Sequence, residues 1–134
     1  MDLLLLNLLI VLPVAAWYIS RRSFPLHTWA TTGVGFGAII SPLSMGLYTT
    51  FFAGPWGLVT GLLGLVSVML HGAVGYNVAI YFGLIQSHTV VSGLQQHFYI
   101  EAINAIVWGA VYGLLGWGID LFLLRRRRSK QNAY

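Results

Sequence analysis

The sequence predicts an all-α protein that crosses a membrane several times. Hydrophobic residues fill 57% of its 134 positions and charged residues only 7%, whereas soluble proteins carry about a quarter charged residues. All seven Lys and Arg residues fall into two short clusters, one near each end of the chain. Between them lie apolar runs that are long enough for helices across a hydrocarbon layer of about 30 Å. We therefore expect a polytopic integral membrane protein with one helical domain, residues 1–134, packed through stripes of Gly and Ala.

The first apolar run, residues 3–19, is expected to be a membrane span. It lacks the basic start of a signal peptide. Trp17 and Tyr18 at its end stand beside a basic pair, as residues at a membrane boundary do. The second run, residues 29–52, is also long enough to span. Because it contains Pro42, we expect this helix to be kinked or locally broken.

The third run, residues 56–85, leaves the number of spans open. A helix of about 30 residues would be roughly 45 Å long, which exceeds one upright span. It forms either one tilted helix or two short helices broken around residues 72–77. The last span covers residues 100–124, and the polar segment 86–98 before it is expected to be a loop or an interfacial segment.

Charge placement gives a second measure of topology. Five spans would put both basic clusters on the cytoplasmic side, as the positive-inside rule favours, whereas four spans would put them on opposite sides. Helix length favours four, and we expect four spans with the basic tail, residues 125–134, in the cytoplasm. The basic residues are interpreted as topology signals that contact lipid headgroups and not nucleic acid, since no basic face lies on a folded domain. They are Arg21, Arg22, Arg125, Arg126, Arg127 and Arg128.

Small residues recur at helical spacing in the last two runs, which predicts close packing between helices. Lipid does not drive helices together by the hydrophobic effect, so small residues that allow close approach take over that role. With about 100° per residue, one stripe of the third run carries Gly57, Gly61, Gly64, His71, Gly72 and Gly75. The corresponding face of the last span carries Ala102, Ala105, Gly109, Gly113, Gly116 and Asp120.

His71 lies near the middle of its apolar run, where an ionisable side chain is a candidate functional residue. The favoured interpretation is a structural hydrogen bond between helices. The alternative is that its imidazole binds a haem, a pigment or a quinone. The primary expectation is that the protein binds no cofactor.

A polar edge on the last helix forms the second candidate site, provided that the helix reaches back to His97. His97 and Glu101 are one turn apart, and Asn104 follows on the same side. A carboxylate is favourable at a helix N-terminus, which is the favoured interpretation of Glu101. A role in proton or ion transfer, or in metal binding, is the alternative. Asp120 is interpreted as a structural partner for an arginine or a neighbouring helix.

The chain has no Cys, and no grouping of nucleophile, acid and base is recognisable, so an enzyme is not favoured. The expected loops lack fixed charge, which suggests either coverage by other membrane protein subunits or immersion in the membrane interface. The leading hypothesis is a small non-catalytic subunit of a larger membrane complex that acts through helix packing. The runner-up is a small homo-oligomeric transporter or channel that uses Glu101, Asn104 and His71. The third hypothesis is a haem-, pigment- or quinone-binding subunit that uses His71.

Overall fold

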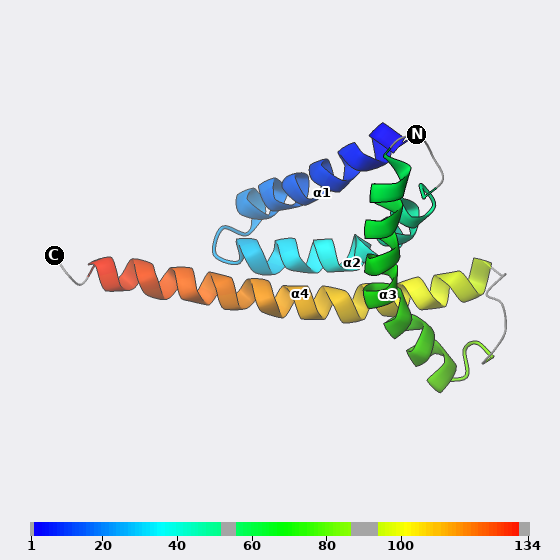
Figure 1. The fold of residues 1–134 in the computed structure, drawn as a ribbon. Coiled ribbons are helices and arrows are strands. Elements are labelled where there is room, and N and C mark those ends of the chain that lie inside the picture. Colours follow the sequence, from blue (N-terminus) through cyan, green and yellow to red (C-terminus); the bar gives the residue numbers. More distant parts are fainter. Residues whose placement is uncertain (1, 52–55, 87–93, 132–134) are drawn as a thin grey trace.

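The computed structural model describes residues 2–51, 56–86 and 94–131, and within these ranges every regular element is an α-helix. The helices are α1 (Asp2–Ser23), α2 (Thr28–Tyr48), α3 (Gly57–Tyr81) and α4 (Leu94–Gln131) (Figure 1). The predicted all-α fold is thus confirmed. Three helices, α2, α3 and α4, are long and apolar enough to cross a membrane, which supports an integral membrane protein. The predicted span over residues 3–19 falls within α1, which is not among these three, so the span count stays a prediction.

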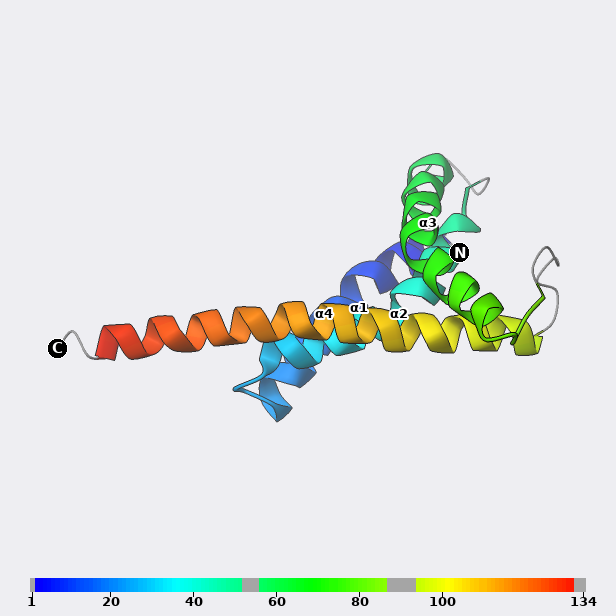
Figure 2. The ribbon, with the colours of Figure 1, turned by 90° about the horizontal axis from the view of Figure 1, so that it is seen from below.

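An antiparallel pair, α2 and α4, forms the centre of the molecule (Figures 1 and 2). These two helices share the most extensive contact in the described residues. α1 runs back along α2 and packs against it. α3 crosses the α2–α4 pair steeply in both views, between the end of α2 and the start of α4.

The proline in α2 does not break the helix. α2 continues through Pro42, and α1 continues through Pro13, so the expected local break at Pro42 is not found. A membrane favours continuity because freed backbone groups in lipid find no water, and neighbouring helices or hydroxyl side chains help to satisfy them. α3 is also unbroken through residues 72–77.

The last helix is longer than the apolar run that predicted it. α4 begins at Leu94, so residues 94–98 of the expected loop are helical, and it continues through the four arginines to Gln131. The segment 95–97 contains no Lys, Arg, Asp or Glu, and it contains no Gly or Pro that would end a helix. Hydropathy indicates which part of a helix is apolar enough for the membrane. The helix propensity of the flanking residues and the capping interactions decide where the helix ends.

Glycines bring the backbones of α2 and α4 into contact. A Cβ at Gly37 would lie 2.2 Å from the carbonyl oxygen of Trp108, and one at Gly33 would lie 2.1 Å from that of Tyr112. From the other side, a Cβ at Gly116 would lie 2.0 Å from the carbonyl oxygen of Trp29. Any larger residue at these positions would push the two helices apart.

The glycines of α3 face α2 and α4 in turn. A Cβ at Gly61 would meet the backbone of Phe51 at 2.4 Å, and one at Gly75 would meet the carbonyl oxygen of Ile100 at 2.4 Å. Gly72 differs, because its added methyl would meet only a side-chain carbon of its own helix at 3.5 Å. The remaining predicted packing glycines of α3 and α4 also lie at helix contacts, with Gly109 the loosest: Gly57, Gly64, Gly109 and Gly113.

Among the residues whose burial the structure describes, 11–51, 56–86 and 94–129, more polar than apolar residues are buried. Five buried residues in these ranges are hydrophobic, and three of them, Ala79, Ile85 and Ile100, form one small cluster where the end of α3 meets α4. Nine in the same ranges are polar or charged, while large apolar side chains are exposed on all four helices. This inverts the distribution in soluble proteins and suits a chain surrounded by lipid or by other apolar surfaces.

Candidate functional site

A buried polar network lies where α3 crosses α2 and α4. His71 of α3 and Asn104 of α4 are its two centres, and both are buried. Hydroxyl groups from α2, α3 and α4 complete it: Ser41, Ser44, Ser67 and Tyr112. The network therefore joins three helices at a single crossing.

Both ring nitrogens of His71 have partners in the protein. Nδ1 lies 2.9 Å from the carbonyl oxygen of Ser67, which can only accept, so this nitrogen carries the proton. Nε2 lies 2.9 Å from the hydroxyl of Tyr112 and in that tautomer accepts its hydrogen bond. The indole N–H of Trp108 donates to the His71 carbonyl oxygen at 2.9 Å, and the two rings meet edge to face at 4.6 Å. A haem or pigment metal could reach Nε2 only by displacing Tyr112.

Asn104 connects all three helices and is completely buried. Its amide oxygen accepts a hydrogen bond from the backbone N–H of Gly75 at 2.7 Å. Its amide nitrogen donates to the hydroxyl of Ser41 at 3.0 Å and lies 3.5 Å from the carbonyl oxygen of Gly72. The bond to Gly75 is unusual because helical N–H groups are normally satisfied within their own helix, and it fixes the height at which α3 crosses α4.

Serine hydroxyls extend the network to α2. The hydroxyl of Ser44 donates to the carbonyl oxygen of Ile40 and contacts the hydroxyl of Ser67, which lies 3.2 Å from Nδ1 of His71. A second hydroxyl pair, Thr50 and Thr60, joins the end of α2 to the start of α3 at 2.6 Å. Each of these groups is paired within the protein, so the network can hold helices together without a ligand.

Known proteins give no guide to this site. In comparisons with protein families, curated proteins and solved structures, nothing matched this chain. Its function is therefore argued from its own geometry.

Glu101 and His97 lie apart from the network. They line an open hollow at the start of α4 together with Leu94, Gln95 and Phe98. Within the described residues no hydrogen bond joins Glu101 to His97, and Oε2 of Glu101 is buried without a partner. The three polar residues named above thus separate, with Asn104 in the network and His97 and Glu101 at the start of α4. No group of three metal-ligating side chains occurs in the described ranges.

Asp120 caps α2 from another helix. Its two carboxylate oxygens accept hydrogen bonds from the backbone N–H groups of Trp29 at 3.2 Å and Ala30 at 2.9 Å. These N–H groups belong to the first turn of α2, which has no side-chain cap of its own. A carboxylate there satisfies open donors and opposes the positive end of the helix dipole.

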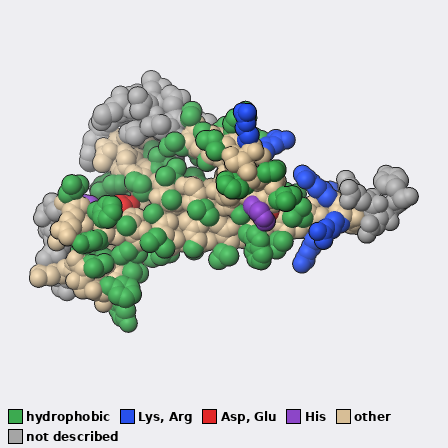
Figure 3. Space-filling model, turned by 180° about the vertical axis from the view of Figure 1, so that it is seen from behind, with side chains coloured by type: hydrophobic (Ala, Val, Ile, Leu, Met, Phe, Trp, Pro, Cys, Tyr) green, Lys and Arg blue, Asp and Glu red, His purple; other side chains and the backbone are tan. Residues whose placement is uncertain are grey.

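The two basic clusters come together at one end of the molecule. Figure 3 shows the arginine side chains as two neighbouring groups there. Arg21 and Arg127 line the same pocket, and the Arg21 guanidinium lies 5.3 Å from the ring centre of Trp17. The expected four-span topology puts these clusters on opposite sides of the membrane, and the five-span alternative puts them on the same side.

Several residues of the network are absent from the predicted sites. Ser41, Ser44 and Ser67 are neutral and small, and nothing in an apolar run distinguishes a serine that faces a partner from one that does not. Gly33 and Gly37 carried a usable signal, because glycines four positions apart share one helix face and favour close packing.

Proposed function

We propose that this chain is a small non-catalytic membrane subunit that acts by helix packing and by contact with other membrane subunits. The observation that carries the proposal is that the buried polar groups at the crossing are bonded to one another. A catalytic or transport site needs polar groups that are free to meet a substrate, whereas a structural site needs them satisfied.

The outer face of α3 is the best candidate for the partner contact. Leu63, Val66, Met69 and Leu70 are exposed along one side of this helix, with Met69 68% exposed. α3 contacts the α2–α4 pair on its glycine side alone, so the opposite side is available over most of its length. Met and aliphatic side chains adapt to another helical surface.

A photo-crosslinking amino acid at Met69, in native membranes, tests this role. We expect crosslinks to a second, different protein at Met69, and lipid adducts alone at Val14 on the outer side of α1. Lipid adducts alone at both positions, together with a purified chain that stays a small monodisperse particle and transports a solute, would refute the proposal.

The topology that accompanies this role has three full crossings, by α1, α2 and α4. Asp120 binds the first turn of α2, which supports a topology with the start of α2 and the end of α4 on one side of the membrane. The end of α2 and the start of α4 then both lie on the opposite side of the membrane, and α3 connects them. One crossing of the membrane by α3 would carry the chain to the wrong side, and α3 is a single unbroken helix. Its steep angle to α4 in both views supports a position across the far side of the bilayer, because helices that span a membrane lie closer to the bilayer normal.

This arrangement puts both basic clusters on the cytoplasmic side and satisfies the positive-inside rule. Because the chain lacks cysteine, single variants can be labelled cleanly with an impermeant maleimide in sealed vesicles. We expect Ser23→Cys and Ser129→Cys to react from the cytoplasmic side and Gln95→Cys to react from the opposite side. Reaction of the first two from opposite sides would restore the four-span topology.

A small transporter or channel is the second candidate, and the buried, unpartnered Oε2 of Glu101 is the observation that favours it. An ionisable group at the edge of a membrane helix can exchange protons or ions. A proteoliposome flux assay that compares the native chain with Glu101→Gln tests this role. Flux that depends on pH and is lost in the variant supports transport, whereas equal flux in both excludes a role for Glu101.

A further inference from the structure

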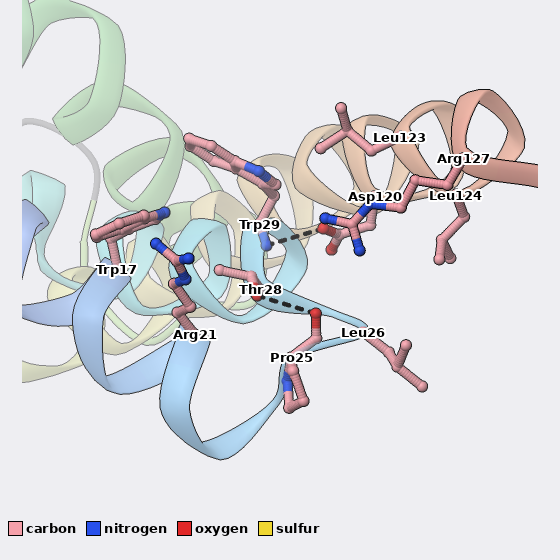
Figure 4. A pocket seen from close by; sticks show the side chains of 10 residues that line it. All are labelled: Trp17, Arg21, Pro25, Leu26, Thr28, Trp29, Asp120, Leu123, Leu124 and Arg127. Atoms are coloured by element: carbon pink, nitrogen blue, oxygen red, sulfur yellow. Dashed lines mark hydrogen bonds between the residues drawn. The ribbon is translucent and has the colours of Figure 1, made fainter. Parts of the chain in front are cut away.

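A pocket of about 340 Å³ lies where the end of α1, the turn into α2 and the last part of α4 meet. Figure 4 shows its walls, in which Arg21 and Arg127 reach toward the first turn of α2 from two different helices. The sequence places these arginines in separate clusters at opposite ends of the chain. Folding therefore creates a paired arrangement that neither cluster has alone.

The pocket has an excess of positive charge. Its single acidic residue, Asp120, already accepts hydrogen bonds from Trp29 and Ala30, one to each oxygen. In the described part of the chain no ion pair joins either arginine to a carboxylate. Arg21 stacks near the ring of Trp17, which orients its guanidinium and leaves its N–H donors available. Two unpaired guanidinium groups thus face one space.

The lining selects the chemistry of a ligand. Arginine N–H groups match the oxygens of a phosphate and bind them in pairs. Apart from Asp120 and Thr28, the other lining residues are apolar or aromatic: Trp17, Pro25, Leu26, Trp29, Leu123 and Leu124. A group that carries a phosphate at one end and hydrocarbon at the other satisfies both. Trp and Arg side by side are also typical of the membrane boundary, where such groups are found.

We propose that this pocket binds one anionic phospholipid, with its phosphate between Arg21 and Arg127 and its acyl chains along Trp29 and Leu123. This goes beyond a general attraction of basic residues to the membrane surface, because it assigns two of the six arginines to a specific site. It is independent of the proposed subunit role, since the pocket is formed by this chain alone.

The test measures binding of phosphatidylglycerol and phosphatidylcholine to the purified full-length protein in mild detergent, by native mass spectrometry. The pocket variant is Arg21→Gln with Arg127→Gln, and the matched control is Arg22→Gln with Arg126→Gln, which removes the same charge outside the pocket lining. We expect the native chain to prefer phosphatidylglycerol. The pocket variant should lose at least about tenfold in affinity and the control less than about threefold.

Equal losses in the two double variants, or equal affinity for the two lipids, would overturn the proposal. Inorganic phosphate and glycerol 3-phosphate serve as competitors, and displacement of the lipid by either one at low millimolar concentration would make this a site for free anions. Circular dichroism checks that each variant stays helical. If the double variant unfolds, Arg127→Gln alone, compared with Arg126→Gln, gives the same discrimination, with an expected loss of about fivefold against less than about twofold.

Discussion

The hydroxyl of Tyr112 lies 2.9 Å from Nε2 of His71 and joins α4 to α3. Tyr112 also meets Phe36 of α2 edge to face at 5.5 Å, so this ring touches both neighbours of its helix. A histidine in the middle of an apolar run is therefore bonded at both ring nitrogens, at Nε2 to the hydroxyl of Tyr112 and at Nδ1 to the backbone of its own helix. The ring nitrogens of His71 are unusual in an apolar run, and one of them, Nε2, holds α3 against α4.

Removal of the tyrosine hydroxyl should weaken this crossing modestly. We expect Tyr112→Phe to lower the free energy of unfolding in detergent by about 0.6 kcal/mol, with an upper limit of about 1.7, as found for hydrogen bonds between membrane helices. Denaturation followed by circular dichroism gives the value, and a double-mutant cycle with His71→Ala isolates the pair. Tyr81→Phe is the control, since Tyr81 is 84% exposed. A coupling energy near zero would show that the bond adds no stability.

Asn104 should be the most costly polar residue to remove. Asn104→Ala removes the hydrogen bonds to the N–H of Gly75 and to the hydroxyl of Ser41, in a place with no exposed surface. We expect a loss of about 1–3 kcal/mol in the free energy of unfolding. Asn77→Ala is the matched control, because Asn77 is exposed and bonds only to the backbone of its own helix. Equal effects of the two substitutions would contradict the network.

Two glycines of α2, two positions apart, should respond in opposite directions. Gly37→Ala forces a methyl against the carbonyl of Trp108 and should cost about 1–3 kcal/mol as α2 and α4 separate. A methyl at Gly35 meets nothing within 4 Å, so Gly35→Ala should stabilise the helix by up to about 1 kcal/mol. Thermal unfolding of both variants in the same detergent measures the difference. The same sign for both would mean that the face of α2 is assigned wrongly.

The two carboxylates of α4 should also differ. Asp120→Asn keeps the shape, but its amide nitrogen cannot accept a hydrogen bond, so one of the two bonds to the start of α2 is lost. We expect a loss of about 0.5–2 kcal/mol. Glu101→Gln removes a carboxylate whose Oε2 has no partner in the described residues, and should leave stability unchanged or raise it. Unfolding by a graded anionic detergent ranks the two variants. A greater loss in Glu101→Gln would point to a partner of Glu101 outside the described ranges.

Composition and charge placement were enough to predict the all-helical fold and its suitability for a membrane. The span count was not accessible in this way, because hydropathy reports how apolar a helix is and not the angle at which it lies. α3 satisfies every compositional test for a span, yet it crosses α4 steeply. The contact between α2 and the end of α4 bears on that angle, and it depends on side chains that are distant in sequence.

The two central residues of the candidate site could be singled out from the sequence, but the hydrogen bonds between them and their partners could not. His71 and Asn104 stand out because polar groups are rare in apolar runs, and the structure brings them to one crossing. Their serine partners carry no such signal. Gly72 shows the limit of helical arithmetic: it shares the stripe of the packing glycines, but no other helix lies within 4 Å of the methyl that it lacks.

The bond between Asp120 and the first turn of α2 also sets an order of events during synthesis. Ninety positions separate the carboxylate from the N–H of Ala30, so α2 leaves the ribosome long before the group that completes its first turn exists. Until α4 emerges, those N–H groups must find water or lipid headgroups. A chain that stops before residue 120 would therefore present an unfinished helix end at the membrane surface, which quality-control proteases could recognise.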